Sequence, residues 1–165
     1  MTTLSAEQVW AVLDTVPDPE VPVLSLRDLG IVRDVVMTGD AVEVVLTPTY
    51  SGCPATEVIA QSVKDALTAA GCTAVTITQR RAPAWTTDWI SDAGREKLRA
   101  YGIAPPGAVS TVGSVNTIGI RPRHLACPRC GSTDTERLSA YGSTACKSLY
   151  RCLACREPFE HFKPI

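Results

Sequence analysis

The sequence has no excess of charge of either sign and no long apolar run. Its 165 residues carry 16 Lys and Arg against 17 Asp and Glu, a net charge of -1, which disfavours a strongly cationic nucleic-acid binder. No apolar run approaches the ~18 residues needed to cross a bilayer, and the first ten residues lack the cationic flank and apolar core of a signal peptide. We therefore expect a cytoplasmic protein with no membrane partner.

Several catalytic signatures are also missing. There is no dinucleotide-binding fingerprint and no Walker loop, so hydride transfer and nucleotide hydrolysis are unsupported. The two histidines, His124 and His161, have no Glu three residues before them, so the Glu-x-x-His pairs that build di-iron carboxylate sites are absent. These absences favour a protein that is not catalytic itself.

The apolar residues follow the periods of helices and strands. They make up 45% of the chain, as in ordinary globular domains. Their spacing predicts five elements in order: a helix from Ser5, antiparallel strands at 31–37 and 41–47, a helix opening at Pro54, and a strand at 73–78. This α-β-β-α-β order predicts an α+β fold, a small mixed sheet with packed helices.

A stretch rich in Gly, Pro, Ser and Thr separates two regions of unlike charge. Residues 1–100 hold 8 basic and 13 acidic side chains (net -5), whereas residues 101–165 hold 8 and 4 (net +4). We predict an α+β domain at 1–102, a linker at 103–120 and a small C-terminal domain at 121–165. An exposed sheet edge in the first domain would make a homodimer easy to form, and the oligomeric state is left open.

The cysteines of the C-terminal region have metal-ligand spacing. Cys127-x2-Cys130 and Cys152-x2-Cys155, separated by 21 residues, match the paired knuckles of a four-cysteine zinc ribbon. A domain of about 40 residues with few large apolar side chains also needs a metal to fold. Buried free thiols and an iron–sulfur site are the alternatives, and Cys146 is either a buried thiol or a substitute ligand.

Cys53 lies at the predicted start of the second helix. Free backbone N–H groups and the helix dipole lower the pKa of a thiol there, which makes Cys53 a candidate reactive or metal-binding thiolate. A small packing residue is the alternative, and Cys72 is expected to be buried and inert. Asp18 and Glu20 either direct two carboxylates to a common point or form a polar turn, and their spacing alone favours the turn.

Two tryptophans and a basic tail are candidates for partner contacts. Trp85 and Trp89 lie four residues apart, so they either pack in the core or between domains, or form a docking patch. The basic and aromatic side chains of the tail suit either a nucleic-acid surface or an ordinary solvated face. These are Arg129, Arg137, Lys147, Arg151 and Arg156, with Tyr141, Tyr150 and Phe159.

Three motifs together resemble the metal–sulfur cluster biosynthetic family, whose members assist iron–sulfur cluster assembly. They are Asp18-Pro19-Glu20-Val21-Pro22, Asp28-Leu29-Gly30-Ile31-Val32 and Ser51-Gly52-Cys53-Pro54. Residues 47–56, residues 83–90 and the ending Glu157-Pro158-Phe159 are similar to one subgroup. This subgroup comprises the D subunits of phenylacetyl-CoA 1,2-epoxidase (ring-oxygenase) systems of aerobic phenylacetate degradation, and the likeness spans nearly the whole chain.

The resemblance implies an accessory or maturation subunit that assists assembly of an iron–sulfur or iron centre on an oxygenase or reductase partner. Cys53 matches the family's reactive cysteine, and Asp18 and Glu20 match its acidic signature, so these three would hold iron or a cluster transiently. The ribbon, absent from shorter members, would dock the client around a structural zinc. A non-catalytic subunit that docks oxygenase and reductase is the alternative, and a nucleic-acid-binding regulator is a weaker one.

Overall fold

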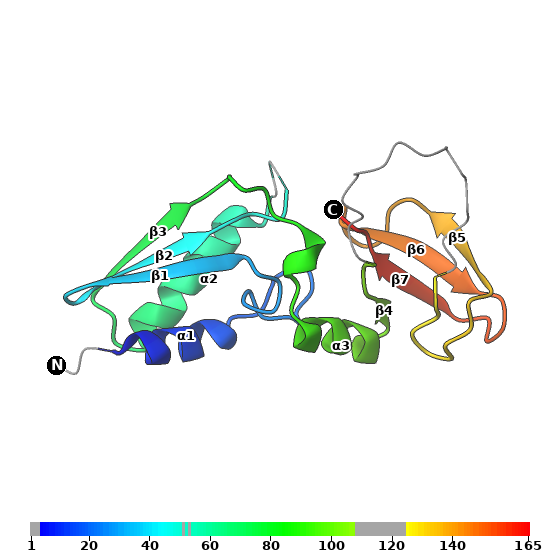
Figure 1. Ribbon diagram of the computed structural model, residues 1–165, viewed down its shortest axis with the longest axis horizontal. Helices are drawn as coiled ribbons and strands as arrows, with labels where there is room; N and C mark the ends of the chain where they lie inside the picture. Colours follow the sequence, from blue (N-terminus) through cyan, green and yellow to red (C-terminus); the bar gives the residue numbers. More distant parts are fainter. Residues whose placement is uncertain (1–3, 51, 53, 108–124) are drawn as a thin grey trace. The chain divides into compact units, whose positions relative to one another are not determined.

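The computed structural model describes residues 4–50, 52, 54–107 and 125–165, and the chain divides into two compact units (Figure 1). The first unit ends at Gly94 and the second begins at Arg95. This boundary falls within helix α3 (Asp92–Tyr101). Among the described residues, no helix is long and apolar enough to cross a membrane.

The first unit confirms the predicted α-β-β-α-β order. Its elements are α1 (Ala6–Asp14), β1 (Val32–Thr38), β2 (Ala41–Leu46), α2 (Thr56–Ala69) and β3 (Ala74–Gln79), followed by the short 3-10 helix η1 (Thr87–Trp89). The sheet order is β1-β2-β3; β1 and β2 form an antiparallel hairpin, and β3 runs parallel to β2. The parallel pair requires a crossover, which α2 supplies.

Local sequence explains how the helices of this unit begin and which face they bury. The Ser5 hydroxyl accepts from the Gln8 backbone N–H, and the Gln8 side chain accepts from the Ser5 N–H, so α1 starts at a capping box. Both helices lie on the same side of the sheet (Figure 1), and each turns an apolar stripe inward. The buried residues are Val9 and Leu13 of α1 and Ile59, Val63 and Leu67 of α2.

The second unit is built on a four-stranded sheet of order β4-β7-β6-β5. Its strands are β4 (Ile103–Ala104), β5 (Thr135–Ser139), β6 (Lys147–Cys152) and β7 (Pro158–Phe162). The last three form an antiparallel meander, while β4 pairs in parallel with β7. The predicted linker at 103–120 therefore begins with two residues that form a strand instead. Its residues from 108 onward lie outside the described residues, and the domain limits stay a prediction.

Candidate functional site

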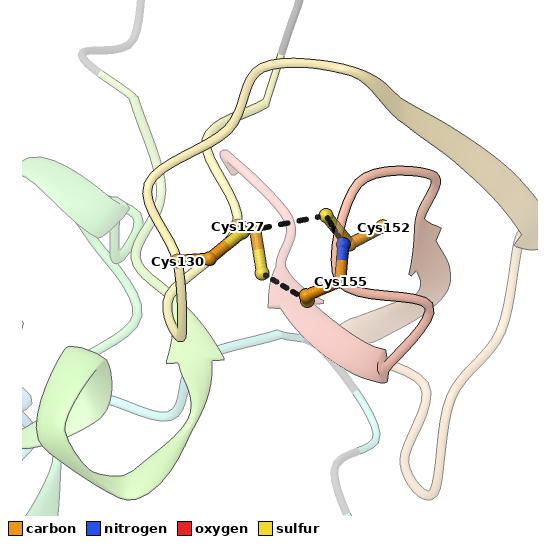
Figure 2. Close-up of side chains that lie close together, drawn as sticks. All are labelled: Cys127, Cys130, Cys152 and Cys155. Atoms are coloured by element: carbon orange, nitrogen blue, oxygen red, sulfur yellow. Dashed lines mark hydrogen bonds between the residues drawn. The ribbon is translucent and has the colours of Figure 1, made fainter.

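Two turns bring four cysteines together in the second unit (Figure 2). Cys127 and Cys130 come from the turn before β5, and Cys152 and Cys155 come from the turn between β6 and β7. Their sulfur atoms all lie within 4.8 Å of one another. The sequence-predicted ligand set is thus assembled at one point, with Cys127 and Cys152 buried and Cys130 exposed.

The spacing of the sulfurs fits a single tetrahedral ion. A zinc ion with Zn–S bonds of about 2.3 Å holds its four sulfurs about 3.8 Å apart. The Sγ atoms of Cys127 and Cys155 are 3.8 Å apart, and those of Cys130 and Cys152 are 3.6 Å apart. A polynuclear iron–sulfur cluster holds some of its cysteine sulfurs farther apart, because it divides the four thiolates among different iron atoms, whereas all four sulfurs here lie within 4.8 Å of one another. The four thiols are therefore arranged as a mononuclear metal site.

The thiols of Cys152 and Cys155, which form the second knuckle, differ in pKa. The backbone N–H of Cys155 lowers the pKa of the Cys152 thiol to about 7, against the opposing effect of burial. The backbone N–H of Glu157 lowers the pKa of the Cys155 thiol, but burial and the neighbouring thiols outweigh it and raise that pKa to about 12. Four adjacent thiols resist losing their protons together, and a bound dication removes this conflict by stabilising all four thiolates.

The cysteines are part of a small core at one end of the sheet. Cys127 and Cys152 cluster with Ala104 and Phe159, and the partly buried Tyr150 packs against this group. The Tyr150 ring stacks on Phe159 at a centroid distance of 5.8 Å and meets His161 edge-on at 5.7 Å. Two of the four candidate ligands therefore share a core with aromatic rings, so a metal bound there would support the packing of this core.

Cys146, the predicted substitute ligand, is not part of the four-cysteine group. It is 6% exposed, and its Sγ lies 3.0 Å from the Thr144 hydroxyl. Its position agrees with the buried-thiol alternative.

The loop that contains Asp18 and Glu20 is stabilised by hydrogen bonds between one of these carboxylates and the loop backbone. Asp18 is 5% exposed, and its Oδ1 accepts the backbone N–H groups of Glu20 and Val21 at 2.9 and 2.8 Å. This is the turn that the spacing of Asp18 and Glu20 favours. The Glu20 side chain is half-buried. Asp18 thus fixes the loop, and its Oδ1 is engaged by these bonds.

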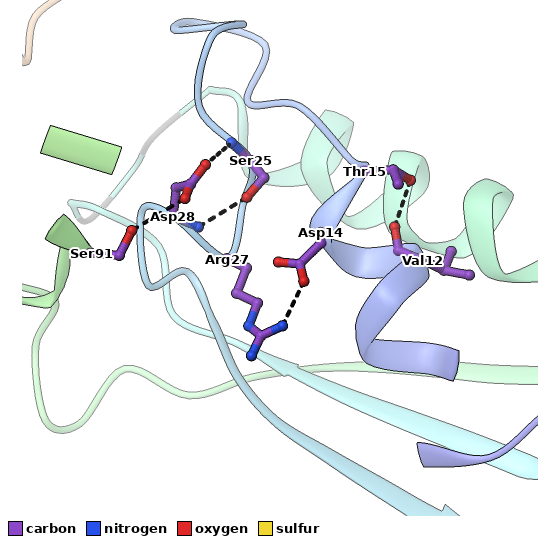
Figure 3. Close-up of polar contacts among 7 residues, drawn as sticks. All are labelled: Val12, Asp14, Thr15, Ser25, Arg27, Asp28 and Ser91. Atoms are coloured by element: carbon purple, nitrogen blue, oxygen red, sulfur yellow. Dashed lines mark hydrogen bonds and ion pairs between the residues drawn. The ribbon is translucent and has the colours of Figure 1, made fainter. Parts of the chain in front are cut away.

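A second buried aspartate, which the sequence does not reveal as a structural centre, joins distant segments (Figure 3). The Asp28 carboxylate accepts the backbone N–H of Ser25 at 3.1 Å and the Ser91 hydroxyl at 3.2 Å. The Asp28 carbonyl also accepts the Ser91 N–H at 2.8 Å. Asp28 therefore ties the segment after η1 to the turn at residues 25–28.

The two tryptophans have different surroundings. Trp85 is 4% exposed, and its indole N–H donates to the Leu29 carbonyl at 2.8 Å, so it takes the core-packing alternative. Trp89 is half-buried under the Arg33 guanidinium, which lies 3.7 Å from the ring centroid. Gly30 lies against Trp89, since an added Cβ would come within 2.8 Å of the Trp89 Cβ. Docking by Trp89 stays a prediction.

Cys53 lies outside the described residues, so its role as a reactive or metal-binding thiolate stays a prediction, but two other residues of this unit are described. Thr47 is 1% exposed, and its hydroxyl has no hydrogen-bond partner within the described part of the chain, although buried hydroxyls normally have one. Thr47 begins the segment that leads to Cys53, and no pattern in the sequence marks it. Cys72, the other cysteine of this unit, is 7% exposed, and burial raises the pKa of its thiol. The expectation that Cys72 is buried is confirmed.

Two family models match separate parts of the chain. One, described as "Iron-sulfur cluster assembly protein", covers residues 6–78, and another, described as "PaaD zinc beta ribbon domain", covers residues 113–163. A crystallised domain of unknown function DUF59 from Bacillus anthracis is similar at a TM-score of 0.52 and 25% identity, over 56% of this chain and 89% of that one. A conserved hypothetical protein from Thermotoga maritima is similar at a TM-score of 0.51 and 29% identity, over 59% of this chain and 98% of that one.

One relative matches almost end to end. The protein of Escherichia coli (strain K12) that is named as the D subunit of a "Putative 1,2-phenylacetyl-CoA epoxidase" is 48% identical over 158 residues. The match covers 96% of this chain and 92% of that protein, so it includes both the assembly-type unit and the ribbon. The chain therefore belongs to the family of 1,2-phenylacetyl-CoA epoxidase D subunits.

Proposed function

We propose that the chain is an accessory subunit of a phenylacetyl-CoA epoxidase system that assists assembly of an iron–sulfur or iron centre on a partner subunit. The observation that carries this proposal is the match of residues 6–78 to iron–sulfur cluster assembly proteins, within a chain that is similar throughout to the D subunit of such a system. The oxygenase and reductase components are the candidate clients, and in this proposal the ring oxidation takes place on the oxygenase.

In this proposal the ribbon binds zinc through Cys127, Cys130, Cys152 and Cys155. The spacing of the four sulfurs supports one ion, and the match of residues 113–163 to a zinc ribbon family supports zinc. Zinc would cross-link the two turns without any redox chemistry. With all four positions taken by protein, the ion is structural, because a catalytic zinc keeps an open position for substrate.

Iron or a cluster is the cargo, and we propose that it is held briefly at Cys53. A site with few protein ligands leaves positions open through which a client takes over the metal. The match of residues 6–78 to iron–sulfur cluster assembly proteins includes Cys53 and supports this proposal. Glu20 is the acidic candidate ligand, while Asp18 would hold the loop in shape through its bonds to the Glu20 and Val21 N–H groups.

The test is the iron and acid-labile sulfide content of the oxygenase core and the reductase, each purified from cells that express different forms of this chain. The forms are the wild type, none, Cys53→Ala, and the matched control Cys72→Ala. Cys72 suits the control because it is a buried thiol in the same unit whose raised pKa keeps it protonated at neutral pH.

We expect iron or sulfide to fall in one partner without the chain and with Cys53→Ala, and to stay at the wild-type level with Cys72→Ala. The partner that loses metal is then the client. If neither partner loses metal while the assembled complex loses activity, the chain is a structural subunit, and the proposed roles of Cys53 and of maturation are both wrong.

A further inference from the structure

The two metal knuckles have the same backbone construction. In each, the first cysteine donates its N–H to the carbonyl of the residue five positions later: Cys127 to Ser132 at 2.9 Å and Cys152 to Glu157 at 3.0 Å. The residue after the second cysteine therefore occupies the same place in both turns. This residue is Gly131 in the first knuckle and Arg156 in the second.

That place requires a left-handed backbone. Gly131 has φ +74° and Arg156 has φ +67°, and Arg156 is the only non-glycine residue with positive φ among the described residues. Glycine adopts this conformation freely, whereas a side chain brings the Cβ close to the backbone and costs free energy. The first knuckle shows that glycine closes such a turn, so the fold alone does not require an arginine in the second.

Side-chain contacts within the described part of the chain do not offset this cost. Arg156 is exposed and makes no ion pair or side-chain hydrogen bond among the described residues. The same holds for Arg129, which lies between the two cysteines of the first knuckle. By contrast, Arg151 of the same unit pairs with Glu136, and Arg95 donates to the Pro106 carbonyl. Within the described part of the chain, the knuckles thus carry two free guanidinium groups beside one metal site.

We propose that Arg156, together with Arg129, is a docking contact for an acidic segment of a partner protein. The inference rests on the proposed function, in which this chain engages the oxygenase or the reductase. A guanidinium binds a carboxylate through two parallel N–H···O bonds, so two arginines on adjacent turns recognise carboxylates with defined geometry.

A protein partner fits these charges better than a nucleic acid. Residues 125–165 contain six Lys and Arg and four Asp and Glu, a net charge of +2. Four thiolates and a dication together add about -2, which brings the ribbon close to neutral. A neutral surface gains little binding affinity for a nucleic acid, because it releases few counterions from the polyanion. Guanidinium and carboxylate groups form direct hydrogen bonds that do not require a net charge on the whole surface.

The test is the affinity of the zinc-loaded full chain for the purified oxygenase core and for the purified reductase, measured separately. We expect Arg156→Gly to weaken binding to one of them by about tenfold or more. Arg156→Lys should cause a smaller loss, since it keeps the charge but not the bidentate geometry. Arg137→Ala, which removes an exposed strand arginine outside the knuckles, should leave the affinity unchanged.

Two further readouts separate docking from a structural role. Arg156→Gly should keep the full zinc content and should melt at the wild-type temperature or above it, because glycine relieves the left-handed conformation. A loss of zinc or a lower melting temperature would overturn the proposal by placing the arginine in the support of the metal. Unchanged affinity for both components would also overturn it, as would binding to a duplex oligonucleotide that Arg156→Gly abolishes.

The docking proposal and the maturation proposal can fail independently. If partner iron depends on this chain but Arg156→Gly binds normally, docking through the knuckles is wrong and maturation stands. If Arg156→Gly loses affinity while partner iron does not depend on the chain, docking stands and maturation is wrong.

Discussion

The two units of the molecule are stabilised by different interactions. In the first, aliphatic side chains from two helices and a sheet form the core, and Leu13, Val44, Val63 and Leu67 are each 0% exposed. In the second, the core around the knuckles combines two cysteines with Ala104 and Phe159. Apolar side chains supply the core of the first unit, whereas in the second the candidate metal ligands are part of the core, so we expect the second unit to depend more on a bound metal. Stability of the two should therefore respond to different changes.

Removal of the metal should produce the largest difference between the units. We expect chelation, or Cys152→Ser, to unfold the ribbon, because structural zinc supplies about 10–16 kcal/mol in comparable small domains. The first unit should keep its fold. Hydrogen exchange followed by peptide mass spectrometry checks this, with amide protection lost over 135–162 and retained over 41–79. Persistent protection of the ribbon strands in metal-free protein would contradict the expectation.

A cavity in the first unit should have the converse effect. Leu67→Ala removes a fully buried side chain of α2 and should lower the free energy of unfolding by about 2–5 kcal/mol, with the zinc content unchanged. Val58→Ala is the matched control, since Val58 lies on the same helix and is 54% exposed. Urea unfolding and zinc analysis measure the two quantities. A parallel loss of zinc in Leu67→Ala would show that the units do not respond separately.

The ribbon also contains a largely buried ion pair, which should matter less than the metal. Lys147 Nζ lies 2.9 Å from Glu160 Oε2, with side chains 5% and 23% exposed. Glu160→Gln weakens the interactions of a buried ammonium and should cost about 2 kcal/mol. Glu136→Gln, at an exposed pair with Arg151, should change stability by less than about 0.5 kcal/mol.

The difference in stability between wild type and Glu160→Gln depends on pH through the ionisation of the Glu160 carboxyl. Burial raises its pKa, but the Ser143 N–H and the Lys147 ammonium outweigh burial and lower the pKa overall. A folded-state pKa below the unfolded value of about 4.3 gives stability that is complete above pH 4.3 and lost as pH falls through the folded pKa. The gap between wild type and Glu160→Gln should thus stay constant from about pH 6 to 8. A gap that closes within this range would contradict the assignment.

The smallest expected effect has the opposite sign. Thr47→Val replaces a buried hydroxyl that has no partner among the described residues by a methyl group of similar shape, and it should raise the stability of the first unit by about 1 kcal/mol. Thr47→Ser keeps the hydroxyl and loses a methyl group, so it should be less stable than the wild type. Thermal melting of both variants checks the order. A destabilised Thr47→Val would indicate that the hydroxyl has a partner in solution.

Local patterns predict much of this molecule, and long-range contacts account for what they miss. The Ser5–Gln8 capping box and the four-cysteine spacing depend on residues close in sequence or on a strongly constrained motif, and both are present. The spacing of Asp18 and Glu20 favours a polar turn but does not exclude two carboxylates that face a common point. The hydrogen-bond partners of a carboxylate depend on how the loop folds, which spacing does not determine. The buried Trp85 donates its indole N–H to the Leu29 carbonyl, which is 56 positions away in sequence. Periodicity carries no information about such a contact.

The short strand β4 limits how the ribbon can be isolated. A fragment that starts at residue 121 would contain every ribbon cysteine but would lack Ile103 and Ala104, which pair with Glu160 and His161. Its β7 would then have an unpaired backbone edge, and Ala104 would be missing from the cluster around Cys127 and Cys152. A fragment that starts at Arg95 keeps this strand and is the sounder choice for expression, because its sheet is complete.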